Sequence, residues 1–253
     1  MAPGSIQAFC FFWFLKKLGA LTYIVDFNLI NADVMTPPRK RYIFDRHFAQ
    51  AAEIMKRPDW LNDMSMPIGI SSAPLKKDRT KLRIGLYPES ARAWLPEFKW
   101  PDARWLELTN LILKNSNCEM ALIGRDKTFP ELEQIFRSQL SEENQSRFIS
   151  LPCSSVEELL ASLQSLDFLI TVNTSALHLA HALKIPLVAL CGSSAEMWLP
   201  EGDHIRIVQD KTAALPPSDK YRHDPLQPSL QRIDVQDVHH AFMDLFKNFP
   251  IKS

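Results

Sequence analysis

The sequence has few glycines and no paired cysteines, and these shortages exclude several kinds of site. Only 7 of the 253 residues are glycine, and no segment has the spacing of a P-loop or of the GxGxxG dinucleotide fingerprint. The four cysteines, Cys10, Cys118, Cys153 and Cys191, are far apart, so no CxxC metal or redox motif is formed. A nicotinamide-dependent oxidoreductase is therefore disfavoured, and the thiols are expected to be buried in a reducing compartment.

The charge balance and the apolar runs are those of an ordinary globular protein. Lysine plus arginine and aspartate plus glutamate each number 29, so the formal net charge is zero, and 46% of the residues are hydrophobic. A neutral chain lacks the positive surface of a general nucleic-acid binder, so no nucleic-acid partner is expected. The aromatic run at residues 8–15 is far shorter than the ~20 residues of a membrane helix. We interpret it as a buried element, with a peripheral membrane patch as the alternative.

Beyond the first third of the chain, short apolar runs alternate with amphipathic segments. The expected strands cover residues 82–86, 120–123, 148–151, 168–170, 187–190 and 204–208. The expected helices cover residues 101–113, 130–140, 155–163, 176–183 and 235–246, with start signals at Pro101, Ser155 and Asp234. Strands that alternate with helices predict a doubly wound α/β domain with a parallel sheet.

The first part of the chain shows no such alternation. We expect only a strand at 21–27 and a helix at 46–55, followed by a linker rich in proline and serine at 64–78. The sequence therefore predicts an N-terminal region, residues 1–78, and a complete domain, residues 79–253.

Two polar turns follow neighbouring expected strands, at residues 173–175 and 192–194. The carboxyl ends of parallel strands lie at one edge of the sheet, where such domains bind ligands. The turn Asn173-Thr174-Ser175 also opens a helix, whose free N–H groups and dipole favour an anion. Thr174 and Ser175 could instead simply cap the helix, as these residue types often do.

His178 lies one turn into this helix. Its simplest interpretation is a buried histidine that is hydrogen-bonded to the backbone. The spacing His178-x-x-His181 could suggest a metal, but one pair without a following carboxylate is a weak signal. We therefore expect no metal site.

Residues 173–183, which read NTSALHLAHAL, are followed by Pro186, Gly192-Ser193-Ser194 and Trp198-Leu199-Pro200. This pattern resembles the nucleotide-sugar half of glycosyltransferase family nine, the heptosyltransferases of bacterial lipopolysaccharide synthesis. A second match joins Pro88-Glu89-Ser90 to Lys99-Trp100-Pro101. The resemblance covers residues 79–210 well and residues 14–64 weakly.

The resemblance implies a GT-B-like fold, with one complete Rossmann-like domain and a shortened N-terminal lobe on the acceptor side. It implies transfer of a sugar from a nucleotide-diphosphate donor, ADP-heptose, to the lipopolysaccharide core. It further implies a cytoplasmic enzyme, peripheral at most to the inner membrane. No cofactor or metal is implied, because lysine and backbone N–H groups can supply the charge that the diphosphate needs.

The resemblance also assigns residues to the donor. Lys99 is implied as the contact to the diphosphate. The remaining implied donor contacts are Asn173, Thr174, Ser175, His178, Ser193 and Ser194. For Thr174 and Ser175 we expect helix capping and donor binding together. Asp126 is implied at the nucleoside, with Glu131 as an alternative, and Met197 and Trp198 are candidates for a wall of the pocket. Lys99 by itself could also be an ordinary surface lysine.

The chain departs from the family pattern at several positions. Asn173 replaces an acidic residue and Ser175 replaces a glycine. Residues 1–43 contain no Gly-Asp turn, which in the family supplies the general base. No catalytic residue is therefore predicted, although Glu89 or Glu97 could substitute. The alternative function is a shortened paralogue that binds a nucleotide or a partner without catalysing transfer.

Overall fold

The computed structural model describes residues 75, 81–89, 96–125, 129–192, 199–216 and 224–249. All of them belong to one of the two units into which the chain divides, residues 67–253. The N-terminal region predicted at 1–78 lies almost wholly outside the described residues. The predicted boundary between residues 78 and 79 therefore stays a prediction.

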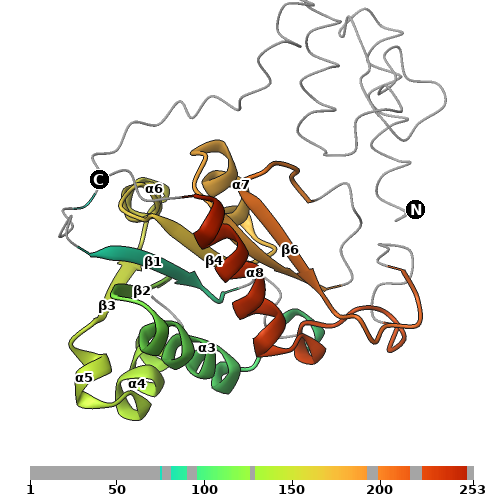
Figure 1. Ribbon diagram of the computed structural model, residues 1–253, viewed down its shortest axis with the longest axis horizontal. Coiled ribbons are helices and arrows are strands. Elements are labelled where there is room, and N and C mark those ends of the chain that lie inside the picture. The colour runs from blue at the N-terminus through green and yellow to red at the C-terminus, as the bar shows by residue number, and fades with distance from the viewer. Residues whose placement is uncertain are drawn as a thin grey trace, which may run out of the picture. The chain divides into compact units, whose positions relative to one another are not determined.

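Six parallel strands form one sheet in the order β3-β2-β1-β4-β5-β6 (Figure 1). The strands are β1 (Leu82–Tyr87), β2 (Cys118–Arg125), β3 (Phe148–Cys153), β4 (Phe168–Val172), β5 (Leu187–Cys191) and β6 (Ile205–Gln209). Each of the expected strands is present, and the doubly wound parallel α/β fold predicted from the sequence is confirmed.

Helices cover both faces of the sheet. One face packs against α3 (Asp102–Asn115), α4 (Phe129–Gln139) and α8 (Val235–Asn248), and the other packs against α6 (Val156–Gln164) and α7 (Ser175–Ala182). These are the five expected helices. The sequence did not predict three further short elements, namely α5 (Glu142–Gln145), η2 (Pro96–Phe98) and η4 (Leu230–Arg232). Elements of three or four residues are too short to show a hydrophobic period.

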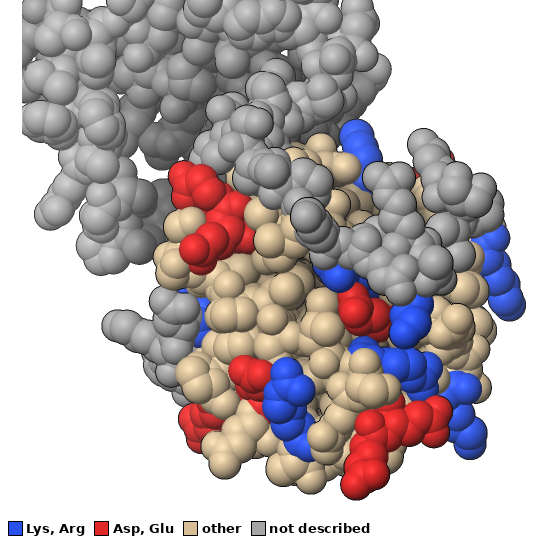
Figure 2. Space-filling model, turned by 90° about the vertical axis from the view of Figure 1, so that its left-hand side faces the viewer, with Lys and Arg blue, Asp and Glu red and all other residues tan. Residues whose placement is uncertain are grey.

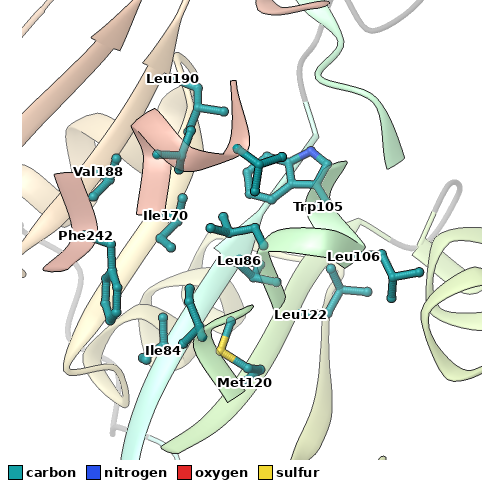
Figure 3. Packing of buried hydrophobic residues seen from close by; sticks show 14 of the residues in the cluster. Ile84, Leu86, Trp105, Leu106, Met120, Leu122, Ile170, Val188, Leu190 and Phe242 are labelled. Carbon is teal, nitrogen blue, oxygen red and sulfur yellow. The ribbon is translucent and has the colours of Figure 1, made fainter. Parts of the chain in front are cut away.

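Alternation along the strands divides the core between the two faces. Ile84 and Leu86 of β1 face the larger cluster, together with Trp105 of α3 and Phe242 of α8 (Figure 3). Tyr87 belongs to the cluster on the opposite face. Successive side chains of a strand point to opposite faces, so a strand buried on both faces is apolar along its whole length.

The helix starts are fixed by the residues that predicted them. The Ser155 hydroxyl accepts from the Glu158 backbone N–H over 3.2 Å, and the Glu158 carboxylate accepts from the Ser154 backbone N–H over 2.6 Å. At α8 the Asp234 carboxylate accepts from the Gln236 backbone N–H over 2.7 Å. Each cap satisfies an N–H group that the helix itself leaves unpaired.

The surface of the described residues carries both signs of charge. On the face that Figure 2 draws, most of the basic side chains lie toward the right-hand side with acidic ones among them, and an uncharged area lies to their left.

Candidate functional site

The strand order reverses between β1 and β4, at the centre of the sheet. From β1 the chain continues to β2 on one side, whereas β4 lies on the other side and continues to β5 and β6. The segments that leave these two strands therefore run to opposite faces, and open α/β sheets bind ligands where such segments separate. The Thr171 hydroxyl joins the two strands there, because it donates to the Tyr87 carbonyl oxygen over 3.2 Å. We take this edge as the candidate site.

The turn between β4 and α7 stands at this edge. The Asn173 backbone N–H donates to the Leu190 carbonyl oxygen over 3.1 Å, which fixes the start of the turn beside β5. Thr174 is the N-cap of α7, but its side chain makes no capping hydrogen bond. The interpretation of Thr174 as a simple side-chain cap is therefore wrong for this geometry. The exposed Ser175 opens the helix, whose first N–H groups attract an anion.

Lys99 precedes α3 and forms an ion pair that the sequence analysis did not include. Its Nζ atom lies 2.8 Å from Oδ2 of Asp102, the first residue of α3. The side chains are 46% and 28% exposed, so water screens the pair and its strength is modest. An anion that binds Lys99 must therefore compete with the Asp102 carboxylate. The spacing of an acidic residue three positions after the lysine could have revealed this pair.

The neighbouring Trp100 fixes the place of Lys99. Trp100 is fully buried, and its ring meets that of Trp105 edge to face at a centroid distance of 4.8 Å. Its Nε1 atom donates to the Ile233 carbonyl oxygen over 3.0 Å. The Lys-Trp-Pro segment thus combines an exposed charge, a core anchor and the N-cap residue Pro101.

The turn before Lys99 reaches the end of β5. A Cβ atom added at Gly192 would lie 3.4 Å from the Glu97 carbonyl oxygen, so the two backbones are nearly in contact. Gly192 directly follows β5, at the same edge of the sheet as Asn173. The structure therefore brings the segment that carries Lys99 to the carboxyl edge where α7 also begins.

Glu89 joins the ends of β1 and β2, a role that the sequence did not indicate. Its Oε2 atom accepts from the Arg125 backbone N–H over 2.9 Å. A Cβ atom at Gly124 would lie 2.9 Å from Oε1 of Glu89 and 2.8 Å from Cδ2 of Phe129. Glycine is therefore required at position 124 for this carboxylate to approach the strand end.

Several predicted site residues lie outside the described residues. These are Asp126, Ser193, Ser194, Met197 and Trp198. Their implied donor contacts stay predictions. Glu131, the alternative to Asp126, is exposed in the first turn of α4.

Burial keeps His178 neutral at ordinary pH. Burial lowers its pKa to about 4. At pH 7 this side chain is therefore a neutral hydrogen-bonding group, which adds no positive charge at this edge.

His181, the other histidine of α7, faces a third histidine. Its Nδ1 atom lies 3.2 Å from Nε2 of His204, and the two ring planes differ by 6°. Burial lowers the pKa of His181 to about 4, with contributions from His204, Lys184 and His178. Burial also lowers the pKa of His204. The pair is therefore uncharged at neutral pH.

These histidines predict a loss of stability in mild acid. The pKa of His178 and of His181 is about 4 in the folded chain and ~6.5 in an unfolded one. Between these values the unfolded state binds more protons, so stability falls as the pH falls from about 6.5 towards 4. We expect the free energy of unfolding to drop by roughly 2–3 kcal/mol between pH 7 and pH 4.5, after allowance for solvent screening. Urea unfolding at several pH values measures it.

The variant His181→Gln separates this cause from general acid effects. It removes one titrating group and should make the pH dependence clearly shallower. Equal slopes for His181→Gln and the parent chain would contradict the assignment.

Within the described ranges, no group of three or more histidine, cysteine, aspartate or glutamate side chains could hold a metal ion. Among the helices that the structure describes, none is long and apolar enough to cross a membrane.

A family model matches most of the chain. The model of glycosyltransferase family 9 (heptosyltransferase) matches residues 34–223. A comparison with curated proteins finds no match.

Solved structures of two heptosyltransferases and of a family 9 glycosyl transferase have a similar fold. The Escherichia coli ADP-heptose lipopolysaccharide heptosyltransferase II is similar with a TM-score of 0.58 and 20% identity over 85% of this chain. A glycosyl transferase family 9 protein from Veillonella parvula is similar with a TM-score of 0.65 and 17% identity, also over 85%. The chain spans 65% and 63% of the lengths of these two proteins. The E. coli heptosyltransferase WaaC, solved with ADP-2-deoxy-2-fluoro heptose, is similar with a TM-score of 0.52 and 14% identity over 85% of this chain. The chain spans 59% of the length of WaaC.

Proposed function

The chain belongs to glycosyltransferase family 9, and on this premise we propose that its described domain binds the nucleotide-diphosphate sugar of a heptosyltransferase. ADP-heptose is the donor that the name of the similar E. coli enzyme gives. A sugar of the lipopolysaccharide core is the proposed acceptor, and transfer would take place at the cytoplasmic side of the inner membrane.

One observation carries this proposal. Lys99 at the start of α3 and the uncapped start of α7 stand at the carboxyl edge of a sheet whose order reverses between β1 and β4. A diphosphate carries charge that suits both a lysine and free helix N–H groups. The dinucleotide fingerprint that would support a nicotinamide cofactor is absent from the sequence.

The residues at this edge have distinct proposed roles. Lys99 and the first N–H groups of α7 would stabilise the negative charge that develops on the leaving ADP. Neutral His178 would donate or accept a hydrogen bond beside the diphosphate. Asn173 would contact the donor without adding negative charge there. Asp102 would hold Lys99 in place until the donor arrives.

The test of this function is diphosphate recognition. By calorimetry, ADP should bind more tightly than AMP, because only ADP offers the second phosphate to Lys99. Lys99→Ala should weaken ADP binding by about 10–100-fold, which corresponds to about 1–3 kcal/mol for a charged hydrogen bond. Asp102→Asn should act in the opposite direction and tighten ADP binding by about twofold to fivefold, since a screened competitor is removed.

Lys114→Ala is the matched control. Lys114 is an exposed lysine in the last turn of the same helix, far from the turn that carries Lys99. Its removal should leave the affinity for both nucleotides unchanged. Equal affinity for ADP and AMP, or no binding of either, would count against the proposed site.

A further inference from the structure

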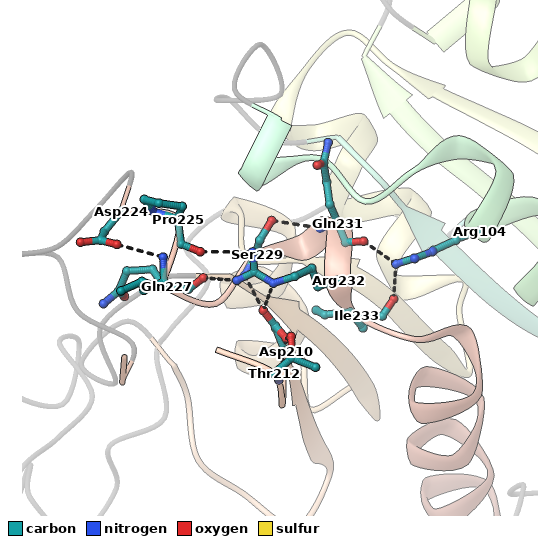
Figure 4. Close-up of polar contacts among 11 residues, drawn as sticks. Arg104, Asp210, Thr212, Asp224, Pro225, Gln227, Ser229, Gln231, Arg232 and Ile233 are labelled. Carbon is teal, nitrogen blue, oxygen red and sulfur yellow. Dashed lines mark hydrogen bonds and ion pairs between the residues drawn. The ribbon is translucent and has the colours of Figure 1, made fainter. Parts of the chain in front are cut away.

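A group of polar contacts outside the proposed donor contacts is centred on Asp210, the residue that follows β6 (Figure 4). Its side chain is fully buried. It accepts hydrogen bonds from the backbone N–H and hydroxyl of Thr212 over 2.8 and 2.6 Å, and from the Ser229 backbone N–H over 3.3 Å. The Nε atom of Arg232 lies 2.6 Å from its Oδ2 atom. A buried carboxylate requires such partners to remain ionised.

The charge state of Asp210 follows from this balance. Burial acts to raise its pKa, but the hydrogen bonds from Thr212, Arg232 and Ser229 outweigh burial and hold the pKa below its usual value. Asp210 is therefore ionised at neutral pH and attracts the Arg232 guanidinium.

Arg232 connects Asp210 to the segment 224–233. Its Nη2 atom donates to the Gln227 carbonyl oxygen, and its Nη1 atom donates to the Pro225 carbonyl oxygen over 3.4 Å. The planar guanidinium thus bonds a carboxylate and two carbonyl groups from three separate nitrogen atoms held in a rigid fork, a geometry that the single nitrogen of a lysine does not offer. The path of the 224–233 segment therefore depends on Arg232.

The same segment holds the start of α3. The Ile233 carbonyl oxygen accepts from Nε1 of Trp100 over 3.0 Å and from Nη1 of Arg104 over 2.6 Å. The Gln231 carbonyl oxygen accepts from the same Arg104 atom over 2.6 Å. Trp100 directly follows Lys99, so the position of this segment determines where the lysine stands.

A backbone contact at Gly192 completes the connection. A Cβ atom added there would lie 3.5 Å from the Pro228 carbonyl oxygen and 3.4 Å from that of Glu97. The end of β5, the turn before Lys99 and the 224–233 segment therefore meet around Gly192, with the Leu230 side chain beside them. A shift of the segment would be passed directly to the turn.

We propose that Asp210 and Arg232 form a positioning pair, which fixes Lys99 at the carboxyl edge of the sheet through the 224–233 segment. The inference rests on the proposed function, because a change in the position of Lys99 is measured as a change in the affinity for ADP. Neither member of the pair is a catalytic residue, since neither is assigned a contact with the donor.

Asp210→Asn is the principal variant. It keeps a similar shape and one oxygen acceptor but removes the charge that holds Arg232. We expect ADP affinity to fall by about 10-fold and AMP affinity to change by less than about twofold, because displacement of one lysine affects mainly the second phosphate. Arg232→Lys, which keeps the charge and loses the fork, should have an intermediate effect.

Asp244→Asn is the control for the loss of an ion pair near β6. Asp244 of α8 pairs with Arg206 of β6, with Nε and Oδ2 also 2.6 Å apart. Within the described residues neither member of this pair is hydrogen-bonded to α3 or to the 224–233 segment, so its loss should leave both nucleotide affinities unchanged. A double-mutant cycle then isolates the mechanism. In the Lys99→Ala background, Asp210→Asn should cause no further loss, and additive losses would overturn the proposal.

Hydrogen exchange of the nucleotide-free chain gives a readout that needs no ligand. Asp210→Asn should speed amide exchange in residues 100–106 and 229–234, whereas Asp244→Asn should not. Unchanged exchange in residues 100–106 would overturn the positioning role even if ADP binds as expected. If the parent chain does not bind ADP, the proposed function fails. Faster amide exchange would then still support the structural link from Asp210 to α3. Unchanged exchange would contradict that link as well.

Discussion

Replacement of Trp100 by alanine is expected to lower the free energy of unfolding by about 3–5 kcal/mol, the usual cost of removing a fully buried tryptophan. For a domain of this size the midpoint of thermal unfolding should fall by roughly 10 °C. Urea or thermal unfolding measures the effect. We also expect ADP affinity to fall, by no more than in Lys99→Ala, because the turn that carries Lys99 loses its anchor.

The physical reason is that Trp100 contributes both to the packing of the core and to a buried hydrogen bond. Its ring packs edge to face on Trp105 inside the larger core cluster, and its N–H group satisfies the Ile233 carbonyl oxygen. Alanine would leave a cavity and an unpaired buried carbonyl group. Both effects add to the lost burial of apolar surface.

Two phenylalanine variants separate packing from hydrogen bonding. Trp100→Phe keeps an aromatic ring but loses the bond to Ile233, at a cost of about 1–3 kcal/mol beyond the change in size. The Nε1 atom of Trp105 is buried and has no hydrogen-bond partner among the described residues. Trp105→Phe therefore removes no hydrogen bond and should cost less than Trp100→Phe. An equal cost for both variants would show that the Ile233 bond contributes nothing.

The second large effect concerns catalysis. We expect the purified 253-residue chain to bind the donor but to transfer sugar at least about 10²-fold more slowly than an ordinary enzyme, that is, below roughly 0.01 per second. The reason is that residues 1–43 contain no Gly-Asp turn to supply the general base. A positioned base typically contributes about 10²–10⁴-fold. Asn173, in place of an acidic residue, weakens the expected donor geometry further.

The assay incubates the chain with ADP-heptose and a truncated lipopolysaccharide acceptor. Released ADP and the mass of the acceptor are measured, with the E. coli heptosyltransferase II as the positive control. Turnover near one per second would contradict the prediction and would direct attention to Glu89, whose carboxylate lies at the end of β1. Glu89→Gln should then abolish transfer. Donor binding without transfer would favour a paralogue that binds only nucleotide.

The Lys99-Trp100-Pro101 segment illustrates how one motif serves both stability and binding. The tryptophan is part of the core, whereas the lysine remains exposed beside Asp102. The resemblance identified the segment but does not include Asp102, although the spacing of three residues was a signal for the pair that the structure shows. The expected response to Asp102→Asn therefore does not follow from the motif alone.

The sequence by itself determined the fold class and the place of the β4–α7 turn. Strands buried on both faces are apolar throughout, and helix starts carry local signals such as Ser155 and Asp234. Both kinds of information lie within a few neighbouring residues, so a pattern is enough to detect them. The order of the strands in the sheet does not lie in any such pattern.

Only the tertiary structure decided how the candidate site is supported. Asp210 and Arg232 are 22 residues apart, and Trp100 and Ile233 are 133 apart, so no local period connects them. Their contacts exist because strand order and helix packing bring the ends of β5 and β6 to the start of α3. A charge in an irregular, proline-rich stretch is ordinarily read as solvated. Burial between packed elements is what turned Asp210 into a fixed partner of Arg232.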